Sequence, residues 1–227
     1  MDLIPYQSLV VSCQALEDEP LYGTHHMVAM ARAAIMGNAS GIRANGIDDV
    51  SAIKKELETT VIGLNKKHYS NSDVFITPTL EDAIKIYEAG ADIVAIDATN
   101  RARPDNLTIQ ETIKKLNELN IPVMADISTY EEGLNAYKYG SDYVSTTLSG
   151  YTSYSKQTDE PDIELVKHLA KQLPIPVVAE GRIRTPKQAL DALKAGAHFV
   201  IVGSAITRPQ EITNSFTEYL EENIKEV

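Results

Sequence analysis

Cysteine is almost absent from this chain of 227 residues, which contains only Cys13. An internal disulfide is therefore excluded, and a lone thiol fits a reducing cytoplasm. Long apolar runs are also absent: 43% of the residues are hydrophobic, yet no run reaches the roughly 18 uninterrupted apolar residues of a membrane span. Residues 1–6 carry Asp2 in place of a basic start, and no apolar signal segment follows. We expect one globular domain over residues 1–227, located in the cytoplasm.

Positive charge is scarce, because 21 Lys and Arg stand against 32 Asp and Glu and give a formal net charge of -11. This balance argues against nucleic acid or an anionic membrane surface as a partner. An anionic small molecule would then need a local cluster of Lys and Arg.

Two patterns of common cofactor sites are missing. No Gly-x-Gly-x-x-Gly turn follows the first predicted strand, which disfavours an open, doubly wound dinucleotide-binding sheet. The five histidines do not pair at the ends of predicted strands. We therefore expect no metal site.

The chain does contain a repeated unit of apolar strand and amphipathic helix. Several of the helices open on Thr or Pro, as at Thr129 and Thr185. Eight such units predict an α/β protein, a parallel eight-stranded (β/α)₈ TIM barrel of the phosphate-binding type. Val74–Thr77 could be a further strand, but we interpret it as part of the loop after the third one. The predicted strands are Leu9–Gln14, Gly41–Asn45, Val61–Lys66, Ile93–Ala98, Val123–Ile127, Tyr143–Leu148, Val177–Glu180 and Phe199–Gly203.

Charged residues gather where a barrel places its chemistry, at the carboxyl ends of the strands. The carboxylates of Asp126 and Glu180 each end an apolar strand. Phosphate sites of barrels often use the loops after strands seven and eight, and Gly181-Arg182 and Gly203 to Arg208 occupy these loops. The alternative is that the glycines only make tight turns and the arginines are solvated rim charges.

Several longer motifs are more specific than the barrel pattern. In order they resemble the N-acylglucosamine-6-phosphate 2-epimerases, also called N-acetylmannosamine-6-phosphate 2-epimerases, over nearly the whole chain. The motifs are Ser12–Leu21, Gly41–Asn45, Gly63–Tyr69 with Ser72–Thr79, Asp97–Thr99, Met124–Ile127, Thr146–Thr152, Ala179–Gly181 and Gly203–Pro209.

The resemblance implies a bacterial cytoplasmic enzyme of sialic acid breakdown. Such an enzyme interconverts N-acetylmannosamine 6-phosphate and N-acetylglucosamine 6-phosphate by inverting carbon 2, and needs no metal or nucleotide cofactor. The family's proton-transfer lysine and its acidic counterpart match Lys66 and Glu180. A homodimer is a possible assembly. The implied sugar and phosphate contacts are Gln14, Arg43, Asp126, Gly181, Arg182, Gly203 and Arg208.

The chemistry explains why a lysine is useful, since a neutral amine can remove the acidic proton on carbon 2 of the ring-opened sugar. This requires a lowered pKa, which burial or nearby Arg43 would supply. Adjacent side chains of an extended segment point to opposite faces, so only one of Lys66 and Lys67 can enter the barrel mouth. The family pattern Gly-x-x-Lys-x-x-Tyr selects Lys66.

Each of the other candidate residues has an alternative role. Asp126 could cap the next helix or pair with Arg43, and Gln14 could satisfy backbone groups. Tyr151 and Tyr154 could form a lid over the sugar or only pack. The competing function is a phosphosugar-binding sensor without catalysis, which would tolerate loss of Lys66.

Overall fold

Eight parallel strands close into a barrel in the computed structural model, which describes residues 3–224. The strands are β1 (Ser8–Cys13), β2 (Gly41–Asn45), β3 (Val61–Leu64), β4 (Ile93–Asp97), β5 (Val123–Asp126), β6 (Tyr143–Ser145), β7 (Val177–Glu180) and β8 (Phe199–Val202). They follow one another around the barrel in chain order, and β8 pairs with β1, with Val10 opposite Ile201. The predicted (β/α)₈ barrel is confirmed.

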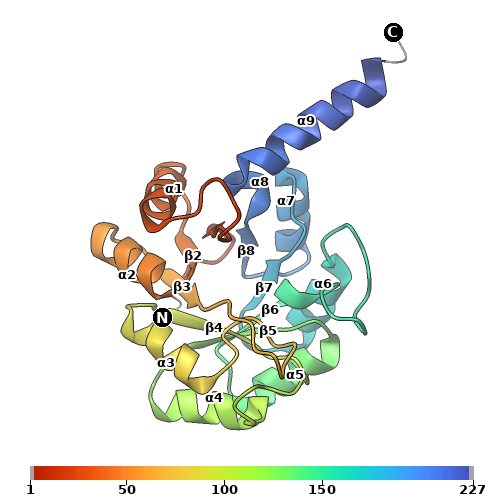
Figure 1. The fold of residues 1–227 in the computed structure, drawn as a ribbon. Helices are drawn as coiled ribbons and strands as arrows, with labels where there is room; N and C mark the ends of the chain where they lie inside the picture. The colour runs from red at the N-terminus through yellow and green to blue at the C-terminus, as the bar shows by residue number, and fades with distance from the viewer. Residues whose placement is uncertain (1–2, 225–227) are drawn as a thin grey trace.

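A helix follows most of the strands and covers the barrel from outside (Figure 1). The helices are α1 (Thr24–Met36), α2 (Ile47–Glu56), α3 (Leu80–Glu88), α4 (Ile109–Glu118), α5 (Tyr130–Tyr139), α6 (Ile163–Gln172), α7 (Pro186–Lys194), α8 (Ser204–Thr207) and α9 (Pro209–Ile224), with a 3₁₀ turn η1 (Thr146–Leu148) after β6. The helix starts predicted at Thr129 and Thr185 are confirmed as capping boxes. No helix among residues 3–224 is long and apolar enough to cross a membrane.

Two strands end two or more residues before their predicted ends, and side-chain hydrogen bonds explain both of these ends. β3 stops at Leu64 because the N–H of Asn65 bonds the Thr77 hydroxyl and the N–H of Lys66 bonds Oδ1 of Asn45, at 3.1 and 2.7 Å. β6 stops at Ser145, and the predicted continuation to Leu148 forms η1. There the Thr146 hydroxyl donates to the carbonyl of Glu180 at 3.0 Å.

The segment Val74–Thr77 is part of the loop after β3, as interpreted from the sequence. It makes an isolated antiparallel bridge between Ile76 and Lys66 and forms no strand of its own. Its carbonyl at Ile76 accepts the N–H of Asp97 at 2.9 Å. The loop is therefore fixed against the carboxyl ends of β3 and β4.

An apolar layer fills the barrel interior. Its members come from alternate positions of the strands, because successive side chains of a strand point to opposite faces. They include Val10, Ile62, Ile93, Met124, Tyr143, Val178, Phe199 and Ile201, all buried. Since this layer leaves no room for a ligand, the open space lies above it, at the carboxyl ends of the strands.

Helix α9 departs from the pattern. It leads away from the barrel and carries the C-terminus outward (Figure 1). None of its described residues is buried. The eighth position in the ring of helices is thus filled only by the short α8.

Candidate active site

A cavity of about 1340 Å³ lies at the carboxyl ends of the strands and extends along the first half of α9. Most of the predicted site residues line it, although they are spread over the whole sequence. The predicted placement at one end of the barrel is confirmed. The lining includes Gln14, Arg43, Lys66, Glu180, Gly181, Arg182, Gly203 and Arg208.

Asp126 lies beneath this cavity and is paired with Arg43. Nη2 of Arg43 is 2.6 Å from Oδ2 of Asp126, and Nη1 is 3.2 Å from Oδ1. Both side chains are almost fully buried, so each charge needs the other to compensate for lost hydration. Asp126 therefore forms the ion pair with Arg43 that the sequence analysis considered as its alternative role.

Arg43 also binds the second carboxylate, because its Nη1 is 3.1 Å from Oε2 of Glu180. The Thr147 hydroxyl stands between the two acids, 2.8 Å from Oδ1 of Asp126 and 3.0 Å from Oε2 of Glu180. Burial raises the pKa of Glu180, with Arg43 acting in the opposite direction and Asp126 in the same one. Glu180 is thus a carboxyl group that can exchange a proton near neutral pH.

Lys66 enters the cavity from the loop after β3. Within the described part of the chain, its Nζ has no hydrogen bond and no carboxylate within salt-bridge distance, and it lies 6.0 Å from the centre of the Phe75 ring. Burial lowers the pKa of Lys66 to about 8, and the positive charge of Arg43 lowers it further against the opposing effect of Glu180. A lysine that is partly neutral at physiological pH can act as a base.

Lys67 has a different environment. Its side chain is 51% exposed, and its Nζ lies 3.7 Å from Oδ1 of Asp82 and 4.8 Å from the centre of the Tyr69 ring. The structure places Lys66 in the barrel mouth and Lys67 on the rim, as predicted.

The loops after β7 and β8 contribute the predicted phosphate-binding residues. Gly181 has φ +106°, a left-handed conformation that favours glycine, and Arg182 follows with φ 56°. The guanidinium of Arg182 donates to the carbonyls of Ser149 and Gly150 at 2.6 and 2.9 Å and lies 4.2 Å from the centre of the Tyr151 ring. These contacts fix the loop after β6 across the cavity.

Arg208 is paired as well. Its Nε is 2.6 Å from Oε1 of Glu19, and its Nη2 is 3.0 Å from Oε2. Glu19 also accepts the N–H of Leu16 and the amide of Gln210. A phosphate that binds Arg208 must therefore displace Glu19 or share the guanidinium with it.

Gln14 has a buried acceptor without a partner. Its Nε2 donates to the Ser12 hydroxyl at 2.8 Å, while its Oε1 is among the buried polar atoms with no hydrogen bond. Buried polar atoms in proteins are nearly always satisfied, so an unpaired one beside a cavity is suited to a ligand. Among residues 3–224, the Gln14 side chain makes no hydrogen bond to a backbone group, so the alternative role is not observed there.

Glu19, Arg101 and Thr147 are among the residues of the site that were not singled out from the sequence. Glu19 and Thr147 lay inside motifs that the sequence analysis quoted. Their roles depend on loops far apart in the chain, so spacing carried no signal. Arg101 lies four residues after Asp97, and only this position behind the end of a predicted strand could have indicated it.

Tyr151 and Tyr154 remain largely exposed, at 59% and 53%. The Tyr154 hydroxyl donates to Oε1 of Glu132 at 2.7 Å, which fixes it on the rim. Among residues 3–224, no group of three His, Cys, Asp or Glu side chains is arranged to hold a metal ion.

Comparisons with known proteins identify the family of this chain. A family model described as "Putative N-acetylmannosamine-6-phosphate epimerase" matches residues 27–222. A relative from Caldanaerobacter subterraneus subsp. tengcongensis, named "Putative N-acetylmannosamine-6-phosphate 2-epimerase", is 54% identical over 226 residues, which are 98% of this chain and 95% of the relative. A relative of the same name from Clostridioides difficile is 49% identical over 215 residues, 95% of this chain and 96% of the relative.

Solved structures extend the comparison. The N-acetylmannosamine-6-phosphate 2-epimerase from Clostridium perfringens has a TM-score of 0.93 at 45% identity, covering 96% of this chain and 95% of that chain. A thiamine phosphate pyrophosphorylase from Pyrococcus furiosus has a TM-score of 0.60 at 20% identity, covering 97% of this chain and 96% of that chain. The second likeness concerns the fold alone.

Proposed function

Because the chain belongs to the N-acetylmannosamine-6-phosphate epimerase family, as its motifs predicted, we propose that it interconverts N-acetylmannosamine 6-phosphate and N-acetylglucosamine 6-phosphate in amino sugar catabolism. One observation carries the proposal: half-buried Lys66, which has no carboxylate within salt-bridge distance among the described residues, faces a cavity that also holds a carboxyl group of raised pKa. A sensor that only binds a phosphosugar has no need of such a base.

Inversion begins when the sugar ring opens and leaves an aldehyde at carbon 1. Neutral Lys66 then takes the proton from carbon 2, and the electron pair of the broken C–H bond moves toward the carbon 1 oxygen. The resulting enolate needs donors near that oxygen. Arg43 supports this role, since its Nε is buried and has no hydrogen-bond partner among the described residues.

Glu180 assists by exchanging a proton with the sugar oxygens. Its Oε2 is held by Arg43 and Thr147, whereas no described residue hydrogen-bonds its Oε1. Return of a proton to the opposite face of carbon 2 completes the inversion. Asp126 positions Arg43, and Gln14 accepts a hydrogen bond from a sugar hydroxyl.

The phosphate binds between the loops that follow β7 and β8. Gly181, Gly203 and Ser204 offer backbone N–H groups at the cavity wall, and Arg208 provides positive charge. Arg182 shapes this wall by holding the loop after β6. The anion is thus bound by local positive charge in a chain that is acidic as a whole.

Incubation with N-acetylmannosamine 6-phosphate, followed by proton NMR, tests the function. We expect N-acetylglucosamine 6-phosphate to form, and to carry deuterium at carbon 2 when the solvent is deuterium oxide. A protein that binds the sugar phosphate but forms no product would be a sensor. Partial retention of the original proton in single turnovers indicates that one shielded base removes and returns it, whereas complete labelling is expected both for a second group on the opposite face and for one base that exchanges its proton with solvent.

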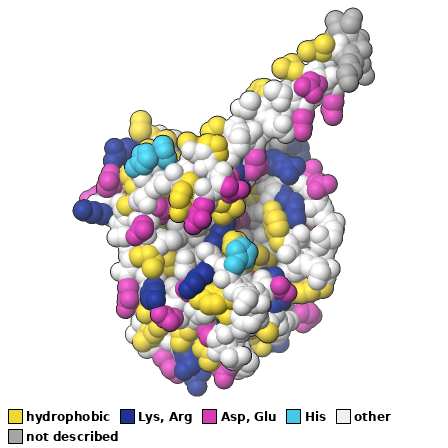
Figure 2. Space-filling model, viewed as in Figure 1, with side chains coloured by type: hydrophobic (Ala, Val, Ile, Leu, Met, Phe, Trp, Pro, Cys, Tyr) yellow, Lys and Arg dark blue, Asp and Glu magenta, His cyan; other side chains and the backbone are white. Residues whose placement is uncertain are grey.

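We further propose that the chain forms a homodimer through α9. Hydrophobic side chains lie along this projecting helix (Figure 2), and the exposed residues include Phe216, Tyr219, Leu220 and Ile224. An isolated helix of this length is marginal in water, so its apolar residues need a partner. A second copy offers an identical helix, together with exposed Leu190 of α7 and exposed Ile206 of α8.

Analytical ultracentrifugation checks the assembly. The wild-type chain should sediment as a dimer, and the double variant Phe216→Ser with Leu220→Ser should sediment as a monomer. Lys114→Ser on α4, whose side chain is 75% exposed, serves as the control, with no change expected. A monomeric wild type would exclude this interface.

A further inference from the structure

The cavity wall opposite the phosphate-binding loops contains, beside Lys66, residues that take no part in proton transfer or phosphate binding. In a barrel closed in chain order, β3 stands opposite β7 and β4 opposite β8. The loops after β3 and β4 contribute His68, Phe75, Ile76 and Arg101 to the cavity. A ligand whose phosphate lies at the β7 and β8 loops directs its other end toward these residues.

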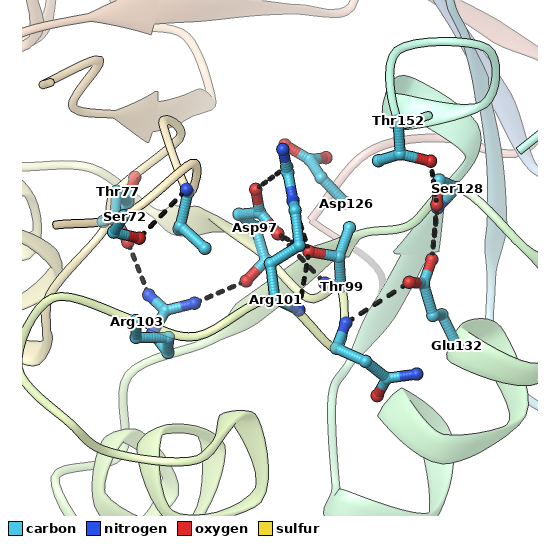
Figure 3. A network of polar contacts seen from close by, with 12 residues as sticks. Ser72, Thr77, Asp97, Thr99, Arg101, Arg103, Asp126, Ser128, Glu132 and Thr152 are labelled. Atoms are coloured by element: carbon cyan, nitrogen blue, oxygen red, sulfur yellow. Dashed lines mark hydrogen bonds and ion pairs between the residues drawn. The ribbon is translucent and has the colours of Figure 1, made fainter. Parts of the chain in front are cut away.

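These two loops are joined into one wall by hydrogen bonds (Figure 3). The Ser72 hydroxyl donates to the carbonyl of Ala102 at 2.6 Å. Buried Arg103 donates to the carbonyls of Thr77 and Asp97 at 2.7 and 2.6 Å. The wall is therefore preorganised, which lowers the entropic cost of binding a ligand there.

Arg101 is held in this wall by two of its three nitrogen atoms. Its Nε donates to the Thr99 hydroxyl at 3.0 Å, and its Nη2 lies 2.5 Å from Oδ2 of fully buried Asp97. Its Nη1 has no hydrogen-bond partner among residues 3–224. A fixed guanidinium with one free nitrogen at a cavity is suited to donate to an oxygen of a ligand.

An apolar surface lies beside the proton-transfer lysine on the same wall. The Phe75 ring stacks on His68 with a centroid distance of 4.4 Å and an interplanar angle of 29°. Nζ of Lys66 is 6.0 Å from the centre of the Phe75 ring. A substituent on the carbon that Lys66 deprotonates is therefore within reach of the Phe75 ring.

We propose that this wall is the subsite for the N-acyl group on carbon 2: Arg101 donates from Nη1 to the acyl carbonyl oxygen, and Phe75 contacts the acyl chain. The inference rests on the proposed function, because it needs carbon 2 beside Lys66 and the phosphate at the β7 and β8 loops. A neutral carbonyl oxygen and a short apolar chain match one donor next to one aromatic face. Arg101 and Phe75 thus select acylated over unacylated sugar phosphates.

A comparison of two ligands in two proteins tests the carbonyl contact. Calorimetric affinities are measured for N-acetylglucosamine 6-phosphate and for 2-deoxyglucose 6-phosphate, which lacks the acylamino group without gaining charge. Arg101→Lys keeps an ion pair with Asp97 but loses the planar group that serves both Asp97 and the ligand. The variant should bind the acetylated ligand about 10-fold or more weakly, and its affinity for the deoxy ligand should fall by less than about 3-fold.

Two further variants keep this test decisive. Arg101→Gln retains a neutral donor to Asp97 and should give the same pattern, and near-ultraviolet circular dichroism checks that both variants are folded. Arg32→Lys, on the exposed surface of α1, is the matched control, and neither affinity should change. Equal weakening of both ligands, or no weakening of either in folded variants, overturns the proposal.

The acyl chain is tested separately through the size of the pocket. Phe75→Ala should raise kcat/KM for the N-butanoyl substrate relative to the N-acetyl substrate by about 10-fold, because the removed ring leaves room for the added methylenes. An unchanged ratio overturns the contact with Phe75. The wild-type protein is assayed for epimerisation in the same experiment, so a wild type that forms product while these ratios stay fixed refutes only the subsite, and one that forms no product refutes the proposed function.

Discussion

Lys66 and Lys67 are neighbours in the chain but lie in opposite environments. Lys66 points into the barrel mouth, where no carboxylate within the described residues pairs with its ammonium group. Lys67 points to the rim, half exposed and paired with Asp82. The backbone that separates them is extended and fixed, because Lys66 forms a bridge with Ile76 and the N–H of Lys67 bonds the carbonyl of Phe75 at 3.1 Å.

The comparison teaches that burial, and not residue type, gives a lysine its reactivity. Burial lowers the pKa of Lys66 to about 8, whereas hydrogen bonding to Tyr69 and the charge of Asp82 raise the pKa of Lys67. The alternation of side chains along an extended segment assigns each lysine to one environment.

The largest expected difference between the two lysines is in rate. Lys66→Ala should lower kcat by at least about 10²-fold, because a sole base is lost. Lys67→Ala should stay within about 3-fold, since solvated rim charges contribute little. NMR of product formation measures both. If the second variant is inactive and the first active, the assignment of the two side chains is wrong.

Arg208, a cation of the same cavity that is paired with Glu19, extends the comparison to substrate binding. Arg208→Ala should raise KM by about 10- to 100-fold, because charge-assisted hydrogen bonds to the phosphate are lost. Binding of the unphosphorylated sugar should be weak in the wild type and unchanged in the variant. Equal affinity of the wild type for both sugars would contradict the phosphate site.

The two lysines should also differ in their effect on stability, because replacing Lys66 should stabilise the protein whereas replacing Lys67 should not. The fall of the Lys66 pKa from 10.5 to about 8 corresponds to at most about 3 kcal/mol by which the folded state disfavours the protonated lysine at neutral pH. Lys66→Met should therefore raise the free energy of unfolding by about 1 to 3 kcal/mol at pH 7, whereas Lys67→Met should not.

The size of this stability effect depends on pH. Because the folded pKa is lower than the unfolded one, the cost is complete below pH 8 and decreases as the pH rises toward 10.5. Urea unfolding at pH 7 and pH 9.5 should show the gain in the variant shrinking. A gain that is equal at both values would contradict burial of the charge as its cause.

A smaller effect is expected in the pH dependence of the wild type. Since only neutral Lys66 can accept the proton, kcat/KM should rise about 10-fold between pH 7 and a plateau reached above pH 8. Lys67→Ala should keep this profile. A profile that is already flat at pH 7 would show that Lys66 does not titrate near 8 in the free enzyme.

Much of this architecture could be predicted because it is local in the sequence. Apolar segments that alternate with amphipathic helices predicted all eight strands, and the carboxylate that ends the seventh strand predicted the end of the barrel that holds Glu180. The period of two along a strand required Lys66 and Lys67 to separate, and the family pattern selected Lys66.

The remainder depends on contacts between distant loops. The pairing of Arg208 with Glu19 joins the last loop to the first, and the placement of Thr147 between two carboxylates requires β5, β6 and β7 to be in register. Neither contact has a spacing that a sequence pattern can reveal. The same holds for the free nitrogen of Arg101, which is defined only once its other donors are seen to be occupied.

The account is tested most directly by titrating both lysines in one sample. Carbon-13 labels at Cε report the protonation of each amine, and Lys66→Ala and Lys67→Ala identify the two signals. The account predicts that Lys66 titrates near pH 8 and Lys67 above 10.5. Two signals that titrate together above pH 10 would contradict it.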